Sequence, residues 1–260
     1  MKTEFHSRAM FSAMPEVSST GHNPDFVAKF LENVRGAVPL TIEQIETMLQ
    51  LITAARGERI QTFLDLGCGN GVLSAAILDE HPEAHGVLVD FSAAVLDTAH
   101  RQLEAHARRV EFLETDFQRR GWVRRVAPHA PLDVVVSGFA IHHLPDARKR
   151  ELYQEIFDLL APEGIFINIE HVASATRWTE SVLDDYMINA IFGPEIKSSP
   201  KKSRAAVARE YYARAGRDAN VLAPLEVQCD WLREIGFENV DCYLKVLELA
   251  VFGGQKPADE

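Results

Sequence analysis

The sequence predicts an α/β fold with a doubly wound, mostly parallel sheet of seven strands. Three observations support this fold class. Apolar, strand-like runs alternate with helical patterns from about residue 60 to residue 170, as expected for parallel strands joined by helices. A glycine-rich turn follows the first strand, and the last segment alternates apolar and polar residues like an antiparallel hairpin. At 260 residues the chain is long enough for one such domain with helical additions.

The segment before the first strand, residues 1–58, is expected to be helical and to cover part of the sheet. Asn23 followed by Pro24 is a typical helix start. Thr41, with Gln44 three residues later, matches the capping box of a second helix. Both predicted helices carry a stripe of apolar residues, so each has one face that can be buried.

Residues 63–71, FLDLGCGNG, are the most informative stretch of the chain. An apolar strand runs into the turn Gly67-x-Gly69-x-Gly71, and a helix pattern starts directly after it. Such a turn points backbone N–H groups at an anionic ligand, and glycines let a cofactor approach without a Cβ in the way. The spacing differs from the G-x-G-x-x-G of dinucleotide-binding enzymes, which disfavours a nicotinamide dehydrogenase. We therefore predict a nucleoside-type cofactor here; the alternative is a turn without a ligand.

The later strands of the predicted sheet also end in polar residues. We expect strands at residues 84–89, 110–113, 132–137 and 165–170, helices at 93–106 and 146–160, and a turn at 162–164. In open parallel sheets, ligands bind beyond the carboxyl ends of the strands. Five polar side chains are expected to meet at this edge: Asp65, Asp90, Asp116, Ser137 and Glu170.

Five segments, FLDLGCGNG, VLVDFS, ETDF, LDVVVSGFAIHHL and LLAPEGIFINIEHV, follow one another in an order and spacing that resemble the class I S-adenosylmethionine-dependent methyltransferases. The resemblance covers about residues 60–171, and the C-terminal helix and hairpin resemble the same family's closing elements. It implies a Rossmann-like fold, S-adenosyl-L-methionine as cofactor and S-adenosyl-L-homocysteine as product.

The resemblance also implies roles for individual residues along the cofactor. Asp65, Gly67 and Gly69 would lie along its methionine part, and Asp90 would hold the ribose hydroxyls. The remaining implied contacts are Phe91 flanking the adenine, Asp116 and Phe117 at the adenine edge, and Ser137 and Gly138 on the sulfonium side.

A stretch of helical character, residues 172–224, interrupts the alternation after the fifth strand. Apolar residues repeat every four positions from Trp178, and Gly193-Pro194 and Ser198-Ser199-Pro200 are expected to separate this first helix from a second one at 202–215. We interpret 172–224 as a substrate-binding cap; the alternative is a packed addition without ligand contact. The predicted division is then 1–58 as N-terminal helical segment, 59–171 with 225–257 as cofactor-binding core, and 172–224 as cap.

Methyl transfer from a sulfonium is an in-line displacement on a donor that is already activated, so binding and positioning dominate. A general base is needed only if the acceptor keeps its proton near neutral pH. The candidate bases are His142, His143 and His171, with a structural role as the alternative. Candidate substrate contacts are Glu170, Tyr186 and Tyr211, although aromatic residues at helical spacing are often core. A lone Glu170–His171 pair is too few ligands to indicate a metal site.

Composition limits the partners that we expect. The net charge is −11, with a pI near 5.4, which disfavours nucleic acid and favours a small-molecule acceptor. Three alternatives stay open: an RNA methyltransferase that uses the basic segment 197–217, a cofactor-binding protein without transfer activity, and an enzyme whose donor is a carboxylated S-adenosylmethionine.

The cysteines and the hydropathy pattern bear on location. Cys68, Cys229 and Cys242 form no C-x-x-C pair, which disfavours a disulfide framework or a zinc site and indicates a reducing, cytoplasmic setting. The sequence contains neither an apolar run of spanning length nor a secretory signal pattern. We therefore expect no membrane partner, and a homodimer is possible.

Overall fold

A computed structural model describes residues 39–57, 60–198, 203–213 and 220–259. The helix predicted to start at Asn23 lies outside these ranges. So do residues 201, 202, 214 and 217, which carry much of the charge of the predicted basic segment. Among the helices within these ranges, none is long and apolar enough to cross a membrane.

The centre of the molecule is a seven-stranded sheet with the order β3-β2-β1-β4-β5-β7-β6. The first five strands pair in parallel, and β7 pairs antiparallel with both β5 and β6. The predicted fold class is therefore confirmed, including the antiparallel C-terminal hairpin. The strands are β1 Thr62–Leu66, β2 His85–Asp90, β3 Val110–Glu114, β4 Leu132–Gly138, β5 Leu160–His171, β6 Glu238–Val246 and β7 Leu249–Gln255.

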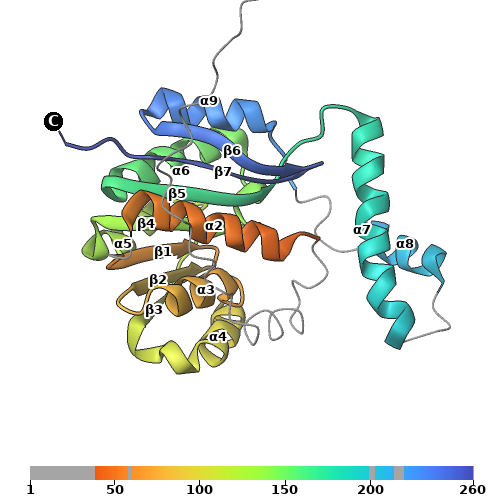
Figure 1. The fold of residues 1–260 in the computed structure, drawn as a ribbon, viewed down its shortest axis with the longest axis horizontal. Helices are drawn as coiled ribbons and strands as arrows, with labels where there is room; N and C mark the ends of the chain where they lie inside the picture. Colours follow the sequence, from red (N-terminus) through yellow and green to blue (C-terminus); the bar gives the residue numbers. More distant parts are fainter. Residues whose placement is uncertain (1–38, 58–59, 199–202, 214–219, 260) are drawn as a thin grey trace, which may run out of the picture.

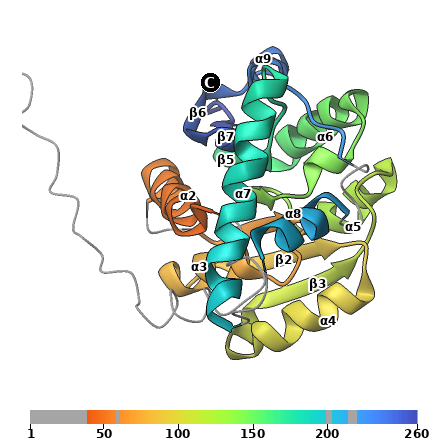
Figure 2. The ribbon, with the colours of Figure 1, turned by 90° about the vertical axis from the view of Figure 1, so that its right-hand side faces the viewer.

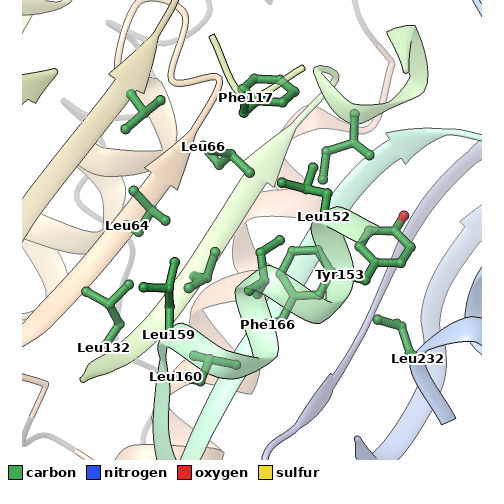
Figure 3. Close-up of a cluster of buried hydrophobic side chains, with 14 of the residues drawn as sticks. Leu64, Leu66, Phe117, Leu132, Leu152, Tyr153, Leu159, Leu160, Phe166 and Leu232 are labelled. Atoms are coloured by element: carbon green, nitrogen blue, oxygen red, sulfur yellow. The ribbon is translucent and has the colours of Figure 1, made fainter. Parts of the chain in front are cut away.

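Helices cover both faces of the sheet (Figure 1). Helices α2 (Thr41–Arg56), α3 (Val72–Glu80) and α4 (Ala93–Gln102) supply residues to one buried apolar cluster. Helices α5 (Val123–Val126), α6 (Asp146–Leu159) and α9 (Leu225–Ile235) supply residues to the other. In that second cluster Tyr153 of α6 lies beside Phe166 of β5, and Leu232 of α9 lies nearby (Figure 3). Successive strand residues point to opposite sides of the sheet. Strands that are apolar throughout therefore make both faces apolar.

Helices α7 (Arg177–Ser198) and α8 (Arg204–Ala213) fall within the predicted cap. They stand apart from the sheet, beyond the edge that contains the carboxyl end of β5 (Figures 1 and 2). Their shared apolar cluster is small and centres on Ile188, Val207 and Tyr211. The helical character of this stretch is confirmed, and its place puts it at the edge where the parallel strands end.

Four local predictions are wrong in detail. Leu40, not Thr41, occupies the N-cap position of α2. Helix α4 ends at Gln102, and a 3-10 turn, Glu104–Arg109, follows it. Helix α7 continues through Gly193-Pro194 and ends at Ser198, where the second predicted separator, Ser198-Ser199-Pro200, begins. The expected turn at 162–164 is an irregularity within β5, which already pairs with β4 at Leu160.

Candidate active site

The glycine turn after β1 brings bare backbone to the edge of the sheet. Gly67, Gly69 and Gly71 have φ angles of 72°, 56° and 81°, a region that favours glycine. The N–H groups of Gly67 and Cys68 both donate to the carbonyl of Val89, at 2.8 and 2.9 Å. A Cβ on Gly67 would lie 2.4 Å from the Cβ of Ala140. The turn is therefore held against β2 and offers the close backbone approach that a nucleoside cofactor requires.

Asp90 ends β2 directly beside this turn. Its carboxylate accepts the N–H of Gly69 at 3.2 Å and the N–H of Ser92 at 3.0 Å, and the residue is only 8% exposed. The carboxylate is thus fixed between the turn and the start of α4, where it can accept further hydrogen bonds from a diol. Phe91 next to it is 67% exposed, so its ring is available for the face of a base. These features fit a bound adenosyl group.

Asp116 and Phe117 follow β3 and take different positions. The Asp116 carboxylate accepts the N–H of Gln118 at 2.9 Å and stays partly exposed. The Phe117 ring is buried, and its Cε1 lies 3.4 Å from the place that a Cβ on Gly67 would occupy. The Asp116 side chain can therefore contact a ligand, whereas the Phe117 ring packs against the glycine turn.

Three more of the predicted cofactor residues lie at the ends of β1 and β4. Asp65 is buried and accepts a hydrogen bond from the hydroxyl of Ser74 at 2.7 Å. The Ser137 hydroxyl donates to the carbonyl of Leu66 at 2.7 Å, so it ties β4 to β1. Gly138 ends β4. The structure thus brings the predicted cofactor residues to one edge, and their contact with a cofactor stays a prediction.

A first histidine–glutamate pair joins the ends of β4 and β5. Nδ1 of His142 lies 2.5 Å from Oε1 of Glu170, whose carboxylate also accepts the N–H groups of His142 and His171 at 3.0 and 2.8 Å. Because a carboxylate oxygen accepts, this geometry assigns the Nδ1 proton to His142 and leaves its Nε2 as an acceptor.

A second pair lies beside the first. Nε2 of His171 lies 2.6 Å from Oε2 of Glu248, and the Ser174 hydroxyl donates to the other oxygen of this carboxylate. The rings of His142 and His171 are 6.0 Å apart between centroids. The proton on Nε2 faces Glu248, so Nδ1 of His171 is the free acceptor.

The remaining candidates are more scattered. His143 is exposed, with its ring 4.0 Å from that of His142. Tyr211 is buried, and its hydroxyl donates to Asp184 at 2.9 Å. Tyr186 is half-buried on α7. Of the three predicted substrate contacts, only Tyr211 lines the cavity described next, while the Glu170 carboxylate contacts His142.

A cavity of about 480 Å³ opens where β5 meets the cap, a volume typical of sites for small ligands. His171 and Glu248 form part of its wall, and most of the other lining residues are polar. A segment that we call the strap, residues 220–223, forms another part. The Val221 N–H donates to the carbonyl of His142 at 2.8 Å, and the Ala173 N–H donates to the carbonyl of Ala223 at 2.9 Å. The lining residues beyond this pair are Ala173, Ser174, Ala175, Thr176, Arg177, Glu180, Asp184, Tyr211, Asn220 and Leu222.

Glu248 was missed by the sequence analysis, and the strap was included only as part of the predicted cap, 172–224. Glu248 follows β6 in the turn of the hairpin, 77 residues after His171, and no local pattern connects the two. Asn220 follows residues that carry no periodic signal. Within the part of the chain that the structure describes, no group of three or more His, Cys, Asp or Glu residues could hold a metal ion.

Residues 63–164 match a family model described as a methyltransferase domain. Among curated proteins, a carboxy-S-adenosyl-L-methionine synthase from a Nitratiruptor species is 24% identical over 215 residues, 82% of this chain and 82% of that protein. A trans-aconitate 2-methyltransferase from an Azoarcus species is 35% identical over 104 residues. That match covers 40% of this chain and only 36% of the relative.

Solved structures show the same fold. An O-methyltransferase family protein from Burkholderia thailandensis superposes with a TM-score of 0.57 at 19% identity, over 90% of this chain. The match covers 63% of that protein, so the chain spans less than two thirds of its length.

Proposed function

We propose that this chain, whose residues 63–164 match a methyltransferase domain, is a class I S-adenosylmethionine-dependent methyltransferase that methylates a hydroxyl group of a small, polar acceptor bound in the cavity beside β5. The observation that carries the proposal is the pairing of two histidines with glutamates at the edge where the cofactor strands end. One of these histidines, His171, lines the cavity.

The residues at the strand ends hold the cofactor in this proposal. Asp90 accepts the ribose hydroxyls, Asp116 accepts the adenine amino group, and the turn at Gly67 and Gly69 receives the methionine part. When bound, S-adenosylmethionine supplies an electrophilic methyl carbon. The protein then has to place the acceptor oxygen in line with the departing sulfur and to exclude water.

His171 is the proposed general base. Its Nε2 proton is directed at Glu248, so the lone pair on Nδ1 can take the proton from the hydroxyl group that is to be methylated. Glu248 then stabilises the imidazolium that forms, because it is already within 2.6 Å. A hydroxyl acceptor needs this step, since it keeps its proton near neutral pH.

His142 with Glu170 has a different proposed role. The His142 carbonyl accepts the N–H of Val221 in the strap, and its ring is nearly buried. The pair therefore shapes the wall between the cofactor strands and the cavity. The predicted cap, 172–224, completes the enclosure through α7 and the strap, which agrees with its proposed role in binding the acceptor.

The first experiment uses S-adenosylmethionine with a labelled methyl group and fractions of a metabolite extract. Labelled product together with S-adenosylhomocysteine is the expected result. His171→Gln is expected to lower turnover at least a hundredfold, as for removal of a general base, with S-adenosylhomocysteine affinity unchanged. His85→Gln is the matched control, because His85 is exposed at the start of β2, at the opposite end of that strand from the site. A larger loss in His142→Gln than in His171→Gln would assign the base to His142 instead.

A second candidate concerns the donor rather than the acceptor. The similarity to the Nitratiruptor carboxy-S-adenosyl-L-methionine synthase covers 82% of both chains, so it extends well beyond the cofactor strands. In this candidate the cavity holds a co-substrate whose carboxylate is released as carbon dioxide. The sulfonium methyl loses a proton to the decarboxylated co-substrate and adds to the carbon dioxide, so the product is a carboxylated S-adenosylmethionine. Mass spectrometry of nucleosides after the same incubation separates the two, because only this reaction adds a carboxyl group to the cofactor.

RNA methylation finds less support in the described residues. Arg204, one of the cations in the basic segment, donates to Asn189 at 2.7 Å and to Asp185 at 2.8 Å within the cap. Its charge is therefore used in joining α8 to α7. Absence of RNA binding at low salt would remove this alternative.

A further inference from the structure

Two buried cations stand next to each other near the start of α6. Arg148 is 9% exposed and Lys149 is fully buried. Positive charge near a helix N-terminus opposes the helix dipole, and burial of a charge is costly unless it is well paired. Each side chain must therefore make compensating contacts. Arg148 contacts the turn that follows β3, and Lys149 contacts the strap.

The Arg148 guanidinium holds the turn that follows β3. It donates to the carbonyl of Phe117 through Nη2 at 2.7 Å and Nε at 3.1 Å, and Nε also lies 3.1 Å from the carbonyl of Gln118. Its other side forms a two-point pair with Glu155 at 3.0 and 2.7 Å. The indole N–H of Trp122 donates to the same carboxylate at 2.7 Å. Glu155 therefore fixes the planar guanidinium of Arg148, and Trp122 in turn fixes the Glu155 carboxylate.

The turn held in this way belongs to the cofactor site. The Gln118 N–H donates to the carboxylate of Asp116, which is the predicted partner of the adenine amino group. The Phe117 ring packs beneath the glycine turn at Gly67. Arg148 grips the backbone of the two residues after Asp116, so it fixes the direction of that carboxylate without being near a ligand itself.

Lys149 holds the other wall. Its ammonium donates to Asp146 at 2.7 Å and to the carbonyl of Val221 in the strap. The N–H of Val221 in turn donates to the carbonyl of His142. Lys149 thus serves the acceptor side, although it is the chain neighbour of Arg148.

We propose that Arg148 is a positioning residue for recognition of the adenine base: through the carbonyls of Phe117 and Gln118 it sets the Asp116 carboxylate to accept the adenine amino group. The proposal rests on the cofactor and on the placement of adenine at Asp116, and it is independent of the acceptor. Lysine cannot replace Arg148, because one ammonium cannot span two carbonyls and a carboxylate as a planar fork does.

The test measures binding by calorimetry with two probes, S-adenosylhomocysteine and S-inosylhomocysteine. Inosine carries a carbonyl where adenine carries its amino group, so a well-directed Asp116 carboxylate rejects it. Arg148→Lys and Arg148→Met are expected to weaken S-adenosylhomocysteine binding by about tenfold, the scale of one charge-assisted hydrogen bond. S-inosylhomocysteine binding is expected to change little, so the preference for adenine falls.

Lys149→Met is the matched control. It removes the neighbouring buried cation, and both affinities are expected to stay within about twofold of the unaltered protein, since differences below that scale are minor. Hydrogen exchange at the Val221 amide should instead become faster, because the strap loses its anchor. Glu155→Gln, which weakens the support of the guanidinium, should reproduce a smaller loss of adenine preference and serves if an Arg148 variant does not fold.

An unchanged ratio of the two affinities in every folded Arg148 or Glu155 variant would overturn the proposal, since a purely structural role weakens both probes alike. Equal loss of preference in Lys149→Met would also overturn it. If the unaltered protein bound neither probe, the cofactor assignment itself would be wrong, which is a distinct result.

Discussion

At Gly67 the neighbouring side chains leave no room for a methyl group. A Cβ there would lie 2.4 Å from the Cβ of Ala140, and the φ angle of 72° is strained for any other L-residue. Gly67→Ala is therefore expected to destabilise the fold by about 1–3 kcal/mol and to abolish S-adenosylhomocysteine binding, as measured by thermal unfolding and calorimetry. Gly121→Ala is the control, because a Cβ at Gly121 meets nothing within 4 Å.

Asp90 allows a second test at the same scale. Asp90→Ala removes the acceptor of two backbone N–H groups and of the proposed ribose hydroxyls. S-adenosylhomocysteine affinity should fall by about 1–3 kcal/mol. Asp97→Ala, an exposed site on the following helix, should leave it unchanged. Equal affinities for unaltered protein and Asp90→Ala would contradict the ribose assignment.

Local sequence predicted which residues lie at the ends of the strands. The glycine turn, Asp90 and Asp116 each follow an apolar run, so their place at the edge could be deduced before any contact was known. Glu248 and Arg148 could not be deduced in this way. Glu248 meets His171 across 77 residues, and Arg148 reaches the carbonyl of Phe117 across 31. Such pairs are made by sheet order and helix packing, which leave no local pattern.

Among the elements, α9 can be tested through Cys229. This residue is buried against the sheet cluster, and burial raises the pKa of its thiol to about 11. The protonated thiol is therefore favoured in the fold. Its contribution to stability is complete below the pKa of an unfolded cysteine and is lost as the pH rises through about 11.

Alkylation of Cys229 in the folded protein should consequently be far slower near neutral pH than in urea, and it should accelerate towards the raised pKa. Peptide mass spectrometry after alkylation measures Cys229 separately from Cys68 and Cys242. Similar rates in folded and unfolded protein would mean that α9 does not pack as described.

Apolar runs in the sequence predicted the strands of the sheet well, because buried parallel strands are apolar throughout. Helix ends were less predictable. Gly193-Pro194 looked like a boundary, yet α7 runs through it and ends only at Ser198. Similarly, Leu40 takes the N-cap position with a φ of 61°, which no propensity scale favours for leucine.

For the whole molecule, the proposed division into core and cap predicts separable functions. Replacing residues 177–213, which include α7 and α8, by a flexible linker should keep S-adenosylhomocysteine affinity within about threefold, because the proposed cofactor residues lie elsewhere. Formation of labelled product from the metabolite extract should be lost. Parallel loss of cofactor binding and turnover would mean that the cap is part of the core. Calorimetry and product analysis of the same preparation provide both readouts.

The antiparallel pairing of β7 with β5 has a consequence for errors in assembly. Leu249 pairs with His171, and the Val172 N–H donates to the carbonyl of Glu248 at 2.8 Å. A slip of this ladder by one residue would turn every side chain of β7 to the opposite face and carry the Glu248 carboxylate away from the His171 imidazole. Misaligned molecules would then be inert as well as unstable. Impaired alignment would therefore lower the specific activity of a preparation for as long as its misaligned molecules stay in solution.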